Sequence, residues 1–227
     1  MQTHATNLRL VKERGRQDRK EKCTEGEFRS DLMLSLDDIL RVSKESHLTN
    51  DVSSLQALQA CFAFNSLLAM GNRPEHARYW KLSFLLLTRR GERAHLTFKN
   101  ILGKKTEQVE FTTVIPHRNP LLCSTGKLGH LLLYRFFHLK EAFPDTEDPA
   151  SYCNFFLLRS AENAARPVTD KAFRETFHRI IFPHARDMQS SDSVTHLPRH
   201  ICQAHAQLSG MSKTVIGETS NIQRSNC

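Results

Sequence analysis

The sequence predicts a mainly α-helical protein with one small β-sheet, an α+β fold. In several segments, apolar residues recur at the three-to-four-residue spacing of an amphipathic helix. Over 94–102 and 108–115 they instead alternate with polar residues, which is typical of strands. The 227 residues are 39% hydrophobic and 25% charged, a composition that suits one large globular domain.

The first 30 residues stand apart from this pattern. They hold eight Lys or Arg and five Asp or Glu, with few apolar residues and no sustained period. This composition predicts a basic arm that is disordered or loosely helical. We expect the folded domain over 31–221 and a short tail over 222–227.

Two helices are predicted at the start of the domain. A short one begins near Ser35 and turns its apolar side chains inward. These are Ile39, Leu40 and Val42. The apolar period over 49–71 predicts a buried core helix, which Thr49 or Asn50 can cap and Gly71 follows.

The next region is predicted to form a helix and then a hairpin. The helix covers 73–87, and Pro74 fits its first turn because an N–H there has no partner within the helix. The two alternating segments follow, with Gly103, Lys104 and Lys105 between them, so two lysines are expected at the tip of a β-hairpin.

Two amphipathic helices are expected in the second half. The first covers 124–139, capped by Ser124 or Thr125, with its inner face made by Leu128, Leu132, Phe136 and Leu139. An acidic loop over 141–151 separates it from the second helix, over 169–182. The inward residues of that helix are Phe173, Phe177, Ile180 and Ile181. A polar linker is expected over 187–195.

The charge of the chain is unevenly distributed. The formal net charge is +8, and residues 71–140 alone hold thirteen basic and four acidic residues, a net +9. Such clustering predicts a polyanionic partner, most simply nucleic acid, with a solvated basic face as the alternative. The six cysteines form no CxxC pair and the N-terminus has no apolar stretch typical of a secretory signal, so we expect a reduced, intracellular protein. No membrane segment is expected.

The stretch THLPRH, residues 195–200, concentrates candidate ligands at a predicted helix start. His196 and Arg199 are three apart and share a helix face, where the helix N-terminus also attracts anions. Arginine binds phosphate oxygens in a fork and histidine donates to the same oxygens, so the pair predicts a phosphate site. A metal half-site and a plain solvated helix start remain alternatives. Zinc is disfavoured because Cys202 and His205 do not complete one face with His196 and His200.

These residues resemble the conserved boxes of tyrosine recombinases. The His-x-x-Arg stretch followed by Gly210 is similar to the second box. Arg73, with Glu75 two residues later, is similar to the first box. The resemblance implies that Lys104 or Lys105 corresponds to the hairpin lysine of that fold.

The block over 117–145 is the most specific part and resembles the central DNA-binding domain of a fungal centromere-binding kinetochore subunit, shared with Crypton-type mobile elements. The residues that keep its pattern are Cys123, Gly126, Leu128, Tyr134, Arg135 and Phe136. The resemblance covers about residues 35–221. It implies a recombinase-like fold that binds double-stranded DNA through the backbone, in the nucleus. The residues expected at the DNA are Arg73, Lys104, Lys105, Arg118, His196, Arg199 and His200.

The sequence also departs from the recombinase pattern. All three tyrosines, at 79, 134 and 152, precede the second box, so no nucleophile follows it. We therefore expect a protein that binds DNA without cutting it and needs no cofactor or metal. A Crypton-type recombinase or transposase fragment is the first alternative and a protein-interaction scaffold the second, with homodimerisation left open.

Overall fold

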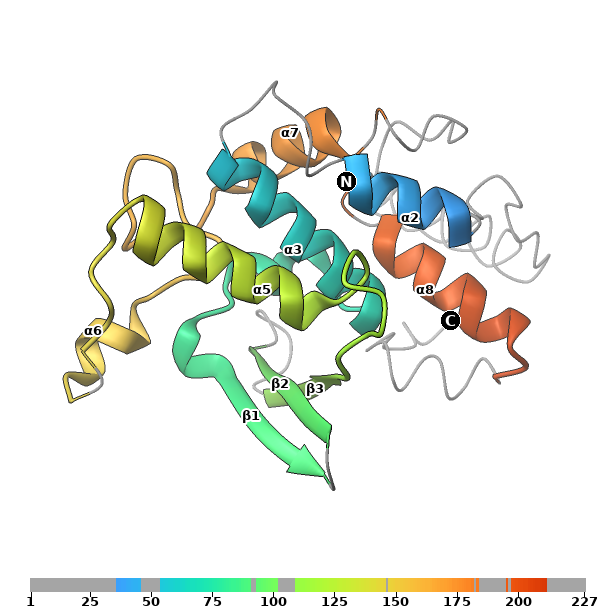
Figure 1. Ribbon diagram of the computed structural model, residues 1–227, viewed down its shortest axis with the longest axis horizontal. Coiled ribbons are helices and arrows are strands. Elements are labelled where there is room, and N and C mark those ends of the chain that lie inside the picture. Colours follow the sequence, from blue (N-terminus) through green and yellow to red (C-terminus); the bar gives the residue numbers. More distant parts are fainter. Residues whose placement is uncertain are drawn as a thin grey trace, which may run out of the picture.

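The computed structural model describes residues 36–45, 54–90, 93–101, 109–145, 147–181, 183, 195 and 197–211. The predicted arm and tail lie outside these residues, as does the predicted linker except for Thr195, which is buried. Within the described residues the predicted fold class is confirmed, because the chain is mainly helical with one three-stranded antiparallel sheet at the edge of the helices (Figure 1). In this part of the chain, no helix is both long and apolar enough to cross a bilayer.

Helix α3 (Ser54–Met70) is the centre of the fold, as its apolar sequence predicts. Twelve of its 17 residues are buried, so it has no solvent face of its own. It packs on α5 (Ser124–Leu133), α7 (Asp170–Ile180), α8 (Leu197–Leu208) and the sheet (Figure 1). Gly71 ends it with φ +63°, a conformation that glycine adopts without strain.

Helix α2 (Leu36–Glu45) is joined to this centre by a buried polar pair. Ser43 donates to the side-chain oxygen of Asn65 at 2.9 Å, and the amide of Asn65 donates to the Leu121 carbonyl at 2.7 Å. Ile39 and Val42 are buried as predicted, and Leu40 is half-buried. The inward face predicted for α7 is also confirmed, since all four of its apolar residues are at most 4% exposed.

The predicted helix over 73–87 is wrong beyond its first turns. Helix α4 (Pro74–Arg78) ends early, the 3-10 turn η2 (Leu82–Phe84) follows, and β1 (Leu85–Arg90) then begins an extra strand. The chain leaves the helix because Trp80 is drawn into the core, 1% exposed, where its indole N–H donates to Asn100. Three consecutive leucines then continue as a strand.

The sheet has the order β1-β2-β3, with β2 (Arg93–Ile101) and β3 (Val109–Val114) paired antiparallel as predicted. Its inner face buries Leu96, Phe98 and Val114 against the helices. The apolar residues whose alternation predicted β3 lie on the other face and are exposed. The predicted lysine tip lies outside the described residues.

Helix α5 is capped by Cys123, so the expected Ser124 or Thr125 cap is wrong. The Cys123 sulfur accepts from the Gly126 N–H at 3.4 Å. The helix then widens into one π-helical turn, η3 (Tyr134–His138). Leu128 is buried as expected, whereas Leu139 is 38% exposed because the chain has already left the helix there.

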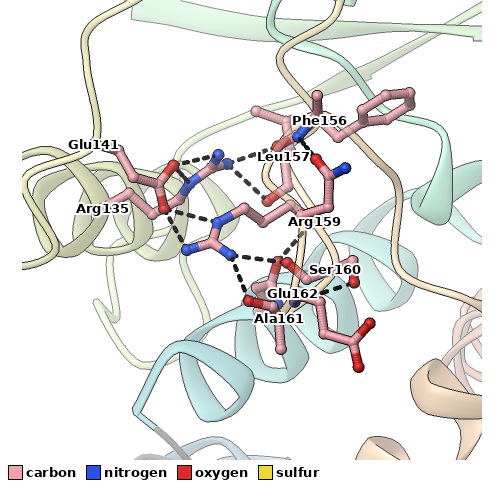
Figure 2. Close-up of polar contacts among 11 residues, drawn as sticks. Arg135, Glu141, Phe156, Leu157, Arg159, Ser160, Ala161 and Glu162 are labelled. Carbon is pink, nitrogen blue, oxygen red and sulfur yellow. Dashed lines mark hydrogen bonds and ion pairs between the residues drawn. The ribbon is translucent and has the colours of Figure 1, made fainter.

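Arg135, from the most specific block of the sequence, is a structural residue (Figure 2). Its Nε and Nη2 donate to Glu141 Oε2 at 2.9 and 2.7 Å, and Nη1 donates to the Phe156 carbonyl at 2.6 Å. Arg159 donates to the other carboxylate oxygen at 2.7 Å. We call Arg135, Glu141 and Arg159 the paired arginine cluster. It joins η3 to the segment after α6 (Pro149–Cys153). Helix α6 begins within the stretch over 141–151 that was expected to be an acidic loop.

Candidate nucleic-acid interface

The structure describes four of the seven residues expected at DNA. Arg73 is exposed at the N-cap of α4, and Arg118 is exposed between β3 and α5. Arg199 lies in the first turn of α8 and is only 7% exposed, whereas its neighbour His200 is exposed. The remaining three, Lys104, Lys105 and His196, lie outside the described residues.

A buried polar network fixes the backbone next to Arg73. Asn72 is fully buried, and its amide donates to Thr112 Oγ1 on β3 at 3.0 Å. The same hydroxyl also accepts from Asn100, whose oxygen accepts from Trp80 Nε1 at 2.9 Å. These hydrogen bonds form a continuous series from Asn72 to Trp80, so the turn before α4 is held rigidly against the sheet.

Arg199 is buried, and part of its guanidinium is unsatisfied within the described residues. Helix α8 packs on α3, and the Nη1 atom of Arg199 makes no hydrogen bond with any described residue. Burial lowers the pKa of this guanidinium, and the charge of Arg73 lowers it further. An unsatisfied buried donor costs about 1–3 kcal/mol, so this N–H is available to an anion that reaches it.

His76 and Glu110 complete the group. Burial lowers the pKa of His76 from 6.5 to about 4, and both arginines contribute, so the ring is neutral at pH 7. Burial raises the pKa of Glu110 on β3, against the opposing charges of Arg73 and Arg199. His76 Nδ1 and Glu110 Oε2 also have no hydrogen-bond partner among the described residues. We call these four residues the unpaired arginine cluster.

The cluster is suited to holding a phosphate oxygen. Two guanidinium groups from helices 126 residues apart supply charge and forked donors, and a neutral histidine adds a third donor. The sequence predicted the two arginines but missed His76 and Glu110. The spacing of His76, one helical turn after Arg73, was a usable signal. Nothing in the sequence indicated which face of β3 carries Glu110.

No group of three metal-ligating side chains occurs in the described ranges. The four-residue zinc alternative includes His196, which lies outside those ranges.

A family model matches residues 43–220, and it is described as the centromere DNA-binding protein complex CBF3 subunit, domain 2. The match includes both arginines of the unpaired cluster and all of the paired cluster. The chain belongs to this family. A comparison with curated proteins found no match.

Solved recombinases share the fold. The chain is similar to XerH site-specific recombinase bound to difH substrate, in a pre-cleavage complex, with a TM-score of 0.58 and 12% identity over 85% of this chain and 47% of that one. It is also similar to FLP recombinase in a Holliday-junction complex, with a TM-score of 0.52 and 12% identity over 96% and 52%. The chain therefore spans about half the length of these recombinases. The expected tyrosine-recombinase catalytic-domain-like fold is confirmed.

Proposed function

We propose that this chain is a nuclear DNA-binding domain that grips the phosphate backbone of a duplex with Arg73 and Arg199. The observation that carries the proposal is the buried Nη1 of Arg199, which has no described partner and lies within the electrostatic reach of Arg73. Family membership and the recombinase-like fold support a DNA partner.

The other expected contacts widen the grip. Arg118 is exposed on the segment that leads from β3 to α5, and His200 is exposed next to Arg199. Lys104, Lys105 and His196 are proposed contacts on sequence grounds, since they belong to the hairpin tip and the second box. Most of these cations come from the net +9 stretch of the chain.

We infer that the chain holds DNA without cutting it. Tyr134 stacks on His138, with 4.6 Å between the two ring centres. Tyr152 lies on α6, far from α8 in Figure 1. Tyr79, the third tyrosine, is at the C-cap of α4 with the Arg78 guanidinium over its ring. None follows the second box, where a recombinase nucleophile is expected. The Crypton-type recombinase remains the second candidate because the boxes themselves are present.

The proposal is tested by salt titration of duplex binding. Arg73→Ala and Arg199→Ala should each weaken binding about tenfold or more, and each should make the log–log salt slope shallower by about one. Lys171→Ala, at an exposed site on α7, is the matched control and should change neither quantity much. If the two arginine variants bind like the wild type, the assignment of the grip is wrong.

A suicide duplex that traps a phosphotyrosine separates the two candidates. The DNA-holding function predicts no covalent adduct, whereas an adduct that Tyr79→Phe abolishes would establish cleavage by this chain. Absence of any duplex retention at low salt would instead favour the interaction scaffold.

A further inference from the structure

The outer face of the sheet exposes apolar side chains at both sides of the central strand, where Thr97 is buried. Strand register places Leu86, Thr97 and Thr113 in one row across the three strands, with Lys99 and Phe111 paired in the next. Alternation then brings Val109 and Ile115 to the same face as Phe111. We call the side chains of Leu86, Lys99, Val109, Phe111 and Ile115 the outer sheet face.

The apolar side chains of this face are far more exposed to solvent than apolar side chains in a protein core. Phe111 is 64% exposed, Leu86 and Ile115 are each 55% exposed, and Val109 is 45% exposed. Apolar side chains gathered in this way on one sheet face mark an interaction site. A single exposed leucine would need no such explanation.

The charges around the outer sheet face are positive. Lys99 Nζ lies 5.7 Å from the centre of the Phe84 ring, and Lys81 Nζ lies 5.8 Å from the same ring. Among the described side chains on this face there is no carboxylate, because Glu110 alternates to the opposite face with Thr112. A partner must therefore offer an apolar surface with acidic neighbours.

The chain itself carries such a surface at the end of α5. Leu133, Phe137 and Phe143 are 55%, 70% and 68% exposed, and Phe143 packs on Phe136 at 4.9 Å. We call these three exposed side chains the η3 ridge. Lys140 is the one described base in the turn that follows, against three exposed acids, Asp145, Glu147 and Asp148.

We propose that the outer sheet face of one copy docks on the η3 ridge of a second copy. Two outer sheet faces packed on each other would bring like charges together, which disfavours the simplest face-to-face dimer. The outer sheet face has basic neighbours and the η3 ridge has acidic ones, and both expose apolar side chains, so the unlike pair is the complementary one. The contact involves neither Arg73 nor Arg199.

Introducing one charge on each of the two surfaces tests the proposal by sedimentation of the purified chain without DNA. At about 100 µM, where a contact of micromolar affinity is occupied, the wild type should self-associate. Phe111→Glu should weaken the association at least about tenfold because it places an acid against the acidic neighbours of the η3 ridge. Phe137→Lys should do the same because it places a base against the basic sheet face.

Mixing the two variants gives the decisive result. In the mixed pair one contact is native and the other joins the new Glu to the new Lys, so association should return. Met211→Glu adds the same charge at another exposed apolar site and should associate like the wild type. Each variant changes an exposed side chain, and circular dichroism verifies its fold.

A monomeric wild type at this concentration would overturn the proposal. So would two variants that still associate, or a mixture that stays monomeric. None of these outcomes bears on duplex binding, which is measured separately.

Discussion

Two arginine clusters in this domain bury similar side chains in opposite ways. In the paired cluster, Arg135 is 0% exposed and Arg159 10% exposed, and each donates to a different oxygen of Glu141. In the unpaired cluster, Arg199 is 7% exposed and its Nη1 donates to no described residue. One oxygen of the nearby Glu110 carboxylate also has no hydrogen-bond partner in the described part of the chain.

The difference separates residues that hold the fold from residues that are kept ready for a ligand. Burial raises the pKa of Glu141, but the hydrogen bonds and charges of Arg135 and Arg159 outweigh it and hold that pKa below its usual value. At Arg199 burial and the charge of Arg73 outweigh the nearby charges of Glu75 and Glu110, so its pKa stays below its usual value. A buried N–H without a hydrogen-bond partner weakens the native state, and a bound phosphate would remove that cost.

The largest effect is expected from breaking the paired cluster. Glu141→Ala leaves two guanidinium groups buried without their carboxylate, which should lower the free energy of unfolding by about 3–5 kcal/mol. Urea denaturation followed by circular dichroism measures it. Glu162→Ala is the control, since Glu162 lies in the neighbouring turn and is exposed (Figure 2).

An E141A variant as stable as E162A would contradict the structural role of the cluster. The fraction of E141A that remains folded should bind duplex DNA with the wild-type salt slope, because neither Arg135 nor Arg159 belongs to the grip.

A smaller effect is expected from Glu110, the acid within the unpaired cluster. Burial raises its pKa in the free protein, and an incoming phosphate would raise that pKa further. Duplex binding should therefore take up a proton, so affinity should rise as the pH falls from about 7.5 to 5.5. Glu110→Gln should bind about two- to fivefold more tightly at the higher pH and lose this part of the pH dependence.

The same substitution has a defined sign for stability. Because the folded-state pKa of Glu110 is raised, its stabilising contribution is present below pH 4.5 and is lost as the pH rises through the folded-state pKa. Glu110→Gln should consequently stabilise the free domain slightly at pH 7 and have no effect at pH 4. An E110Q variant with wild-type affinity throughout the pH range would remove Glu110 from the phosphate site.

Periodicity predicted the elements whose burial follows from local pattern. The inward residues of α7 and the β2–β3 pairing were both readable because a 3.6- or two-residue period ran through each segment. The region over 79–87 was misjudged because Trp80 leaves the helix for tertiary reasons, to reach Asn100 on β2. The sequence around Trp80 does not indicate that Asn100 is its hydrogen-bond partner.

The candidate site was predicted only in part. Resemblance to recombinase boxes brought Arg73 and Arg199 together, which no local period could do across 126 residues. Their shared influence on the pKa values of His76 and Glu110 supports that pairing. The role of Arg135 was not predicted, because a structural arginine and a DNA-binding arginine look the same in sequence until the carboxylate of Glu141 is located.

The most direct test of the unpaired cluster is Arg199→Met, measured for both stability and duplex affinity. We predict a free energy of unfolding equal to the wild type or up to about 1 kcal/mol higher, since a buried unsatisfied donor is replaced by an apolar chain of similar length. Duplex affinity should fall about tenfold or more, while Arg179→Met, which removes an exposed charge on α7, should leave it nearly unchanged. A loss of several kcal/mol in stability with wild-type affinity of the folded protein would contradict the account, because Arg199 would then hold the fold and not the DNA.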